Sequence, residues 1–378
     1  PPTSPRQLAS PTPSASTRPS ETSVTPTATS TPTPSPTSFA PERCTLYGEL
    51  TYEHQVTYEV IETNHKFNFQ EIRAPRSMCH NTSDDTLVIT NEHEVLSLDP
   101  KTSKVETLID ENLTGLSSDQ GSKFRFQQLR ECIIDKTGNL YLADTSTSEV
   151  YYADLEAKRI NTLQHRPYDY FSPTSLTTKF SFNVYFALTP QNQVLLADSQ
   201  HLYAVEDSSL KLLFRTYFSN SSQYSGVRDT LFPQKVGPNY MIRDMASIEG
   251  IATDDKGNIY MTSTIQNALF KLAPDKKVFL VNPTATNQLY ETGARYLPAS
   301  TIHTFEYSPK YGVFFGSGPV VFTRDGCLRG MTAPPDSNDR PTDSYITDIA
   351  STNDGSVYIF DSEKMRISRL EIPPDLPE

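Results

Sequence analysis

The sequence lacks several features that would assign it to a well-defined class. No run of 18 apolar residues occurs, so no segment is long enough to span a membrane as a helix. None of its four cysteines forms a Cys-x-x-Cys pair, which argues against a structural zinc site. Lys and Arg number 33 against 45 Asp and Glu, for a net charge of −12. Because no basic stripe offsets phosphate repulsion, nucleic acid is excluded as a partner.

Motifs of known enzyme mechanisms are missing as well. There is no Gly-x-Ser-x-Gly elbow and no phosphate-binding glycine loop, and the seven histidines form no ligand-spaced pair. The sequence therefore leans against an enzyme without deciding the question.

The first 40 residues differ from the rest. They contain ten prolines, nine serines and ten threonines, with no aromatic residue before Phe39. Such a segment cannot bury enough apolar surface to offset its ordering entropy, so we expect a disordered linker or stalk over 1–40. The composition suits both an O-glycosylated stalk and a bacterial lipoprotein linker. A chain that starts at Pro1 rather than Met is expected to be processed or excerpted.

The remaining residues, 41–378, carry a repeated unit. Six apolar pairs open a strand at intervals of 44 to 65 residues: Leu87-Val88, Leu140-Tyr141, Val194-Leu195, Ile259-Tyr260, Val313-Phe314 and Val357-Tyr358. A first strand precedes each pair across an Asp/Asn/Gly turn, as in Ile133–Asp144, and a third and usually a fourth strand follow. A recurring unit of roughly 40–50 residues with several strands is typical of a β-propeller.

The sixth unit has no fourth strand, because the chain reaches Pro373-Pro374 soon after Leu370. Residues 44–61 alternate like a strand but belong to no unit. We therefore predict an all-β fold: a six-bladed β-propeller that this N-terminal strand closes, preceded by the disordered Pro/Ser/Thr-rich segment. Closure removes exposed strand edges, whereas a solenoid, the alternative, needs no returning strand.

The first strand of each propeller blade lines the central channel, so residues before each turn are candidate ligand-binding residues. They include Arg130, Glu131, Glu249, His303 and Asp348. Glu249, Asn183 and Asp348 could hold a divalent cation, calcium being the candidate, through oxygen ligands. The alternative, which we favour, is that Arg130 or Arg76 pairs with these carboxylates and that no cofactor is bound.

Two long loops carry further candidates. Residues 217–244 include Tyr224, Arg228 and Tyr240, and residues 164–182 add more aromatic side chains. Aromatic residues with Arg on long loops suit a recognition surface, but they equally suit loops that fold onto their own blade.

The cysteines and sequons bear on location. Cys79 and Cys132 occupy the same place in neighbouring units, and we interpret them as core packing, while Cys44 and Cys327 could form a disulfide that latches the ring. Asn81, Asn112 and Asn220 are possible N-glycosylation acceptors. With the stalk-like N-terminus, they favour a secreted or cell-surface glycoprotein, which we expect to be a monomer.

Two segments carry a resemblance to known families. Gly138-Asn139-Leu140-Tyr141-Leu142-Ala143-Asp144 resembles the core of the NHL repeat, and Gly257-Asn258-Ile259-Tyr260 repeats it. Gluconolactonase/regucalcin-type six-bladed propellers share this signature. A weaker similarity to yellow/major royal jelly proteins lies in Ala74-Pro75-Arg76 and Ile248–Ala252, although those proteins commonly carry tryptophan and this chain has none.

The resemblance covers about residues 74–371 and implies two functions from different classes. NHL domains are mostly interaction platforms, which implies an extracellular binding module that recognises a protein, a glycan or a small ligand through channel-mouth loops. The gluconolactonase family implies instead a metal-dependent lactonase or esterase. Its ligands, a Glu, two Asn and an Asp, are matched in part by Glu249, Asn183 and Asp348. The binding module is our leading interpretation and the hydrolase is the alternative.

Overall fold

The computed structural model of the chain describes its residues in segments. These are 54–55, 57–61, 77–110, 112–113, 115–118, 125–163, 180, 183–206, 209–216, 241–242, 247–263, 268–276, 278–280, 305–311, 313–316, 320–322, 328–332, 346–361 and 366–371. They belong to one compact unit, Cys44–Glu378. The predicted boundary near residue 40 lies outside the described segments. Within these segments every regular element is a β-strand, and no helix is long and apolar enough to cross a membrane.

The recurring hairpin turn explains why each unit folds locally. Asp135 ends the first strand of its unit, and its Oδ1 accepts hydrogen bonds from the backbone N–H of Thr137 at 2.8 Å and of Asn139 at 3.0 Å. Gly138 completes the turn with a φ of +86°, which only glycine adopts without strain. Asp254 repeats the same bonds with Lys256 and Asn258. The turn chemistry read from the sequence is therefore confirmed.

The described strands form six sheets, each built from strands that follow one another along the chain, except that β1 and β2 join the last two sheets. The first sheet contains β3 (Ser77–Asn81), β4 (Thr86–Asn91), β5 (Glu94–Asp99) and β6 (Lys104–Ile109). The second contains β8 (Leu129–Ile134), β9 (Asn139–Asp144), β10 (Glu149–Asp154), β11 (Arg159–Thr162) and the short β7 (Ser117–Ser118). The third contains β12 (Tyr185–Leu188), β13 (Val194–Ala197), β14 (His201–Glu206), β15 (Ser209–Thr216) and β16 (Met241–Ile242).

The other three sheets follow the same plan. The fourth contains β17 (Ile251–Thr253), β18 (Ile259–Ser263), β19 (Ala268–Leu272) and β20 (Val278–Leu280). The fifth contains β21 (Phe305–Ser308), β22 (Val313–Gly316), β23 (Val320–Phe322), β24 (Leu328–Thr332) and β1 (His54–Gln55). The sixth contains β25 (Ile346–Ser351), β26 (Val357–Asp361), β27 (Arg366–Glu371) and β2 (Thr57–Val60). All six predicted strand openings lie in the second strand of a sheet.

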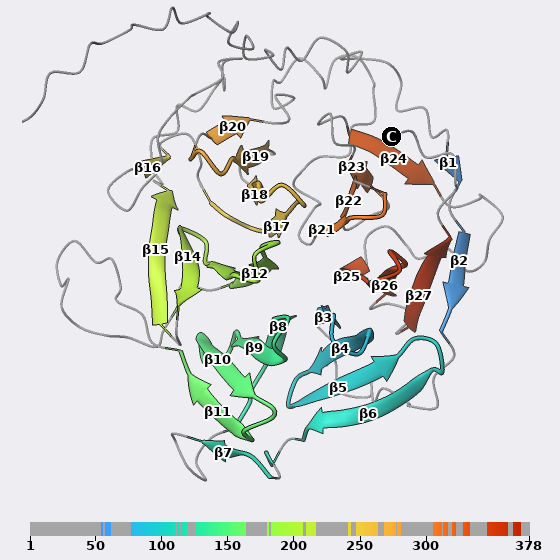
Figure 1. The fold of residues 1–378 in the computed structure, drawn as a ribbon, viewed down its shortest axis with the longest axis vertical. Coiled ribbons are helices and arrows are strands. Elements are labelled where there is room, and N and C mark those ends of the chain that lie inside the picture. The colour runs from blue at the N-terminus through green and yellow to red at the C-terminus, as the bar shows by residue number, and fades with distance from the viewer. Residues whose placement is uncertain are drawn as a thin grey trace, which may run out of the picture. The chain divides into compact units, whose positions relative to one another are not determined.

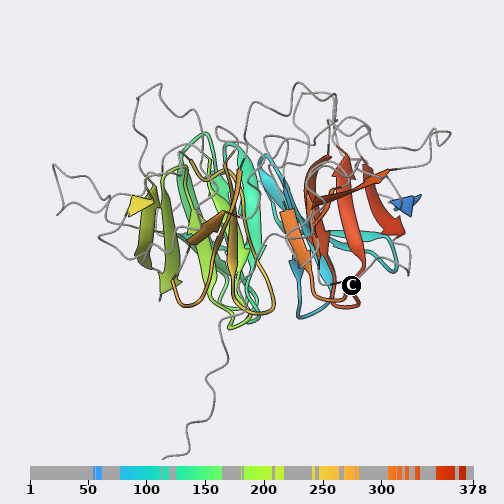
Figure 2. The same cartoon turned by 90° about the horizontal axis from the view of Figure 1, so that it is seen from above.

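The sheets stand around a common axis, each with its first strand innermost (Figure 1). Each innermost strand contacts the innermost strand of the next sheet, and β25 of the sixth sheet contacts β3 of the first. Seen from the side, the strands run roughly along the axis of the ring (Figure 2). This arrangement confirms the predicted all-β propeller.

The hydrophobic core lies between adjacent sheets. One cluster packs Met78, Leu87 and Leu96 of the first sheet against Tyr358 and Phe360 of the sixth. Other clusters join the first sheet to the second, the second to the third and the third to the fourth. From the sixth sheet through the first to the fourth, apolar side chains packed between neighbouring sheets therefore hold the described part of the fold together.

The N-terminal strand β2 belongs to the sixth sheet. It pairs with β27 in an antiparallel ladder, in which Tyr58 lies opposite Leu370 and Val60 opposite Ser368. Glu59 adds an ion pair to Arg369 at 3.0 Å. A segment near the start of the chain thus completes the sheet formed by its last strands.

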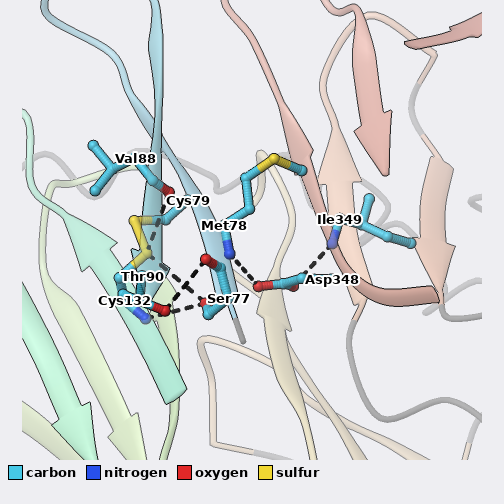
Figure 3. Close-up of a disulfide and its surroundings, with 8 residues drawn as sticks. All are labelled: Ser77, Met78, Cys79, Val88, Thr90, Cys132, Asp348 and Ile349. Carbon is cyan, nitrogen blue, oxygen red and sulfur yellow. Dashed lines mark hydrogen bonds between the residues drawn. A yellow bond between two sulfur atoms is a disulfide. The ribbon is translucent and has the colours of Figure 1, made fainter. Parts of the chain in front are cut away.

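The cysteine interpretation needs a correction. Cys79 of β3 and Cys132 of β8 are not merely packed in the core but form a disulfide between the first and second sheets (Figure 3). The sequence placed them at equivalent positions, and the ring brings these positions together, with their Cα atoms 5.9 Å apart. Cys44 and Cys327, which could form the latch, lie outside the described residues.

Removing β2 should destabilise the whole ring. A chain that begins at residue 62 leaves the hydrogen-bonding groups of β27 without a partner, so we expect a melting temperature lower by roughly 5 °C or more than that of a chain beginning at residue 41. Differential scanning calorimetry of the two proteins measures this. Equal melting temperatures would show that β2 does not secure the ring.

The disulfide should contribute substantially to stability. It links residues 53 positions apart, and loop-closure entropy predicts that the double substitution C79A/C132A lowers the free energy of unfolding by about 4 kcal/mol. Urea denaturation of the variant and the wild type under oxidising conditions gives this difference. A loss below about 1 kcal/mol would mean that the packing of β3 on β8 holds the two sheets without the bond.

Candidate functional site

A cavity runs along the axis of the ring. Its volume is about 450 Å³, and residues of all six innermost strands line it. Because equivalent positions of different sheets meet at the axis, side chains far apart in the sequence come together here. The cavity is therefore the natural place to look for chemistry.

Three carboxyl groups converge in this cavity. Glu131 comes from β8, Glu306 from β21 and Asp348 from β25. The negative charge of Asp348 raises the pKa of both glutamates, which shows that all three groups share one electrostatic environment. No lysine or arginine among the described residues forms an ion pair with any of them.

Burial is the largest cause of the perturbed proton affinities. Burial and, to a smaller extent, the charge of Asp348 raise the pKa of Glu306 to about 8. The pKa of Glu131 lies well above its ordinary value because of burial and the charge of Asp348, with Arg130 opposing the shift. Burial also raises the pKa of Asp348 to about 6, against hydrogen bonds that favour its charged form. At neutral pH the cluster consequently holds both protonated and ionised carboxyl groups.

Asp348 is held in place by the neighbouring strands. Its Oδ2 accepts a hydrogen bond from the backbone N–H of Met78 in β3 at 2.6 Å, and its Oδ1 accepts one from the N–H of Ile349 at 2.8 Å (Figure 3). The hydroxyl of Ser77 in β3 is directed instead to the second sheet, where it donates a hydrogen bond to Sγ of Cys132 at 3.8 Å. With only 5% of its surface exposed, Asp348 joins the sixth sheet to the first at the axis.

Arg130 does not pair with a carboxylate as we expected. Its side chain is exposed, and Nη1 donates a hydrogen bond to Oδ1 of Asn183 at 3.1 Å. Within the described residues it forms no ion pair with Glu131, Glu249 or Asp348. Arg130 falls at a register shift between Leu129 and Glu131, a β-bulge that redirects its side chain towards Asn183. Arg76, the other expected partner, lies outside the described residues.

Glu249 is separate from the carboxyl cluster. It precedes β17, and its Oε1 accepts a hydrogen bond from the hydroxyl of Ser247 at 2.7 Å. Tyr185, from β12, lies between the two regions. Its pKa is raised to about 12 by burial and by the charge of Glu131, with Glu249 adding a smaller effect.

The residues predicted for a cation are not grouped as a ligand set. Asn183 directs its carbonyl oxygen to a guanidinium group, which places a fixed positive charge beside the oxygen that would bind the metal. Among the described residues no three His, Cys, Asp or Glu side chains are grouped as metal ligands. A cation held by Glu249, Asn183 and Asp348 stays a prediction.

Several predicted site residues lie outside the described segments. They are His303, Tyr224, Arg228 and Tyr240. The two aromatic loops fall there as well, except for Phe180 and the residues near 241. Their role in recognition stays a prediction.

The sequence reasoning missed Glu306 and Tyr185 as site residues. Counting back from the turn of the fifth unit pointed to His303, whereas the ladder places Glu306, opposite Phe315, three residues further along the chain. A usable signal was present, because Glu306 is a lone charge between Phe305 and Tyr307 in an apolar strand.

Comparisons with known proteins give a limited result. No protein-family model and no curated protein sequence matches the chain. Among solved structures, it is similar to a streptogramin B lyase, with a TM-score of 0.49, 10% identity, and 84% of this chain and 98% of that chain covered. A virginiamycin B lyase from Staphylococcus aureus gives a TM-score of 0.46 at 9% identity, covering 84% of this chain and 99% of that one. A gluconolactonase from Xanthomonas campestris gives 0.47 at 11% identity, covering 84% and 89%.

The raised pKa values predict a pH-dependent stability with a definite sign. Glu306 binds its proton more tightly in the folded than in the unfolded state, where its pKa is near the ordinary 4.5. The folded state then holds more protons between about pH 4.5 and 8, so this group lowers the free energy of unfolding as the pH rises through that window. We expect Glu306→Gln to unfold like the wild type at pH 4.5 but to be more stable by about 1–3 kcal/mol at pH 8.

Denaturant titrations at both pH values measure this effect. The exposed Glu106 of β6 supplies the control, since Glu106→Gln makes the same chemical change outside the cavity and should give no gain in stability at pH 8. A Glu306→Gln variant that gains nothing at pH 8 would contradict the raised proton affinity.

Proposed function

We propose that the axial cavity binds a small polar molecule and cleaves an ester or lactone bond in it by acid–base chemistry. The observation that carries this proposal is the convergence of Glu131, Glu306 and Asp348, from three separate strands, in one cavity. A volume of about 450 Å³ suits a small molecule rather than a protein segment. Carboxyl groups with displaced proton affinities in a cavity are typical of acid–base sites.

Two of the three carboxyl groups take the roles of acid and base. Glu306, with a pKa of about 8, is protonated at neutral pH and can donate its proton to the leaving oxygen. Asp348, with a pKa of about 6, is mainly ionised and can accept a proton from an attacking water. In hydrolysis the water oxygen bonds to the carbonyl carbon, the carbon–oxygen bond of the ester breaks, and the leaving oxygen takes the proton of Glu306.

The proposal takes its reaction class from the carboxyl groups of the cavity and not from the likeness to a gluconolactonase. No step passes through a metal, because Glu249, Asn183 and Asp348 do not form a ligand set here. The chemistry assigned to Glu306 and Asp348 needs only a proton donor and a proton acceptor, each within hydrogen-bond reach of the substrate or the attacking water.

We also propose that the six sheets are the six blades of one ring that β2 closes. The pairing of β2 with β27 and the contact of β25 with β3 support this proposal. The Cys79–Cys132 disulfide supports a secreted or cell-surface location, because such bonds persist in oxidising compartments.

A binding module without catalysis is the second candidate. It is favoured by the cavity itself, which offers a site for a small ligand whether or not the ligand reacts. Recognition of a protein or glycan would instead use the channel-mouth loops named in the sequence, with Tyr224, Arg228 and Tyr240.

Hydrolysis of simple lactones and aryl esters tests the proposal. We expect the purified protein to cleave members of such a panel in the presence of a chelator, and Glu306→Gln to lower kcat/KM by about 100-fold because the proton donor is lost. Glu106→Gln is the matched control and should leave activity unchanged.

Three results would count against the proposal. Activity that disappears with the chelator would favour the metal-dependent hydrolase. Ligand binding by calorimetry without turnover would favour the binding module. Equal kcat/KM for Glu306→Gln and the wild type would place the chemistry elsewhere.

A further inference from the structure

The position of Asp348 depends on a strand of another sheet. Of its two hydrogen bonds, the one from Met78 N–H comes from β3 and the one from Ile349 N–H comes from its own strand. Sheets of a propeller are not joined to one another by a hydrogen-bonded ladder, and β3 and β25 belong to separate sheets. A shift of β3 along or away from the axis would therefore withdraw one of the two donors.

What fixes β3 at this point is its link to β8 on the other side. Cys79 lies next to Met78 and is bonded to Cys132. The backbone N–H of Cys132 also donates a hydrogen bond to Oγ of Ser77 at 3.2 Å. Figure 3 shows both links on one side of β3 and the bond from Met78 N–H to Asp348 on the other.

The disulfide is part of the cavity and not a remote cross-link. Cys79, Cys132 and Ser77 all line the same space as the three carboxyl groups. Both cysteines are buried, at 8% and 6% exposure, so the bridge is held by packing on every side. Its geometry is therefore transmitted directly to the residues that touch Asp348.

We propose that the Cys79–Cys132 disulfide and Ser77 together form a positioning element for the Asp348 carboxylate. The bridge and the Ser77 hydroxyl hold β3 against β8, so that Met78 N–H is aimed across the boundary between the first and sixth sheets. This inference deepens the proposed function, since it assigns what orients one of its carboxyl groups, and it rests on that function for its biological meaning. The geometric claim can be tested without any substrate.

The loss of this donor should change the proton affinity of Asp348 in one direction. A hydrogen bond to a carboxylate favours its charged form, so the Met78 N–H opposes the effect of burial. The other groups that act on Asp348 are Glu306 from β21 and Glu131 from β8. Glu131 is itself next to Cys132, so the exchange of the Met78 amide, and not the titration alone, reports the position of β3.

A purely stabilising disulfide would behave differently. It would lower the melting temperature when removed but leave the environment of Asp348 in the folded protein unchanged. A comparison thus needs a variant that destabilises the same region without touching the positioning element. Ile160→Ala meets this requirement, because Ile160 of β11 is fully buried in the cluster that contains Cys79 and Cys132.

The experiment follows the Asp348 carboxyl carbon by NMR in the full chain labelled at aspartate, with Asp348→Asn assigning the signal. We expect Ser77→Ala and C79A/C132A each to raise the titration midpoint of Asp348 by about one pH unit, equivalent to a tenfold higher proton affinity. The exchange rate of the Met78 amide should rise roughly tenfold in both variants, whereas that of Ile349 should not. Ile160→Ala should lower the melting temperature and change neither signal.

Ser77→Ala keeps the disulfide, so the test stands even if C79A/C132A does not fold. The proposal would be overturned if Ser77→Ala and a folded C79A/C132A both kept the titration midpoint of Asp348 and the exchange rate of the Met78 amide found in the wild type. Because these signals are recorded without substrate, failure of lactone hydrolysis would contradict the proposed function and leave the positioning result intact.

Discussion

The hydrogen bond from Met78 N–H to the Asp348 carboxylate joins the first innermost strand of the ring to the last, and the site depends on this junction. Residues 270 positions apart in the sequence meet there. The same contact orients a carboxyl group of the cavity and ties the sixth sheet to the first. Charge-assisted hydrogen bonds to backbone amides are among the stronger ones, and this one is buried. The contact that holds the sixth sheet against the first thus also orients the Asp348 carboxylate in the cavity.

The cluster follows from the symmetry of the ring. Equivalent positions of six sheets point to one axis, so acidic residues at even half of them are forced into proximity. Taking carboxylates out of water and placing them near one another costs free energy, which the protein reduces by retaining protons. That cost is offset by apolar packing between sheets, where residues such as Leu87, Leu96 and Phe360 are almost fully buried. Acid–base sites commonly combine a stable scaffold with ionisable groups that are held in an unfavourable environment.

Much of the fold could be predicted from the sequence because its signals are local. Asp135 and Gly138 define a hairpin by their own backbone chemistry, and the apolar pairs mark the second strand of every sheet. The site was predicted in part. Glu131 and Asp348 were found by counting from the turns, whereas the same counting gave His303 in the fifth unit and missed Glu306. Pairings such as Cys79 with Cys132, or Arg130 with Asn183, depend on how sheets are set against one another, which no local pattern specifies.

The central claim is that the Glu306 carboxyl in the axial cavity retains its proton at neutral pH. Infrared difference spectroscopy of the wild type against Glu306→Gln at pH 7 tests it most directly, because a protonated carboxyl has its own carbonyl absorption. The account predicts a protonated-carboxyl band in the wild type that the substitution weakens, and the part lost should fade as the pH is raised above about 8, the pKa of Glu306. A wild type whose carboxyl groups are all ionised at pH 7 would contradict it.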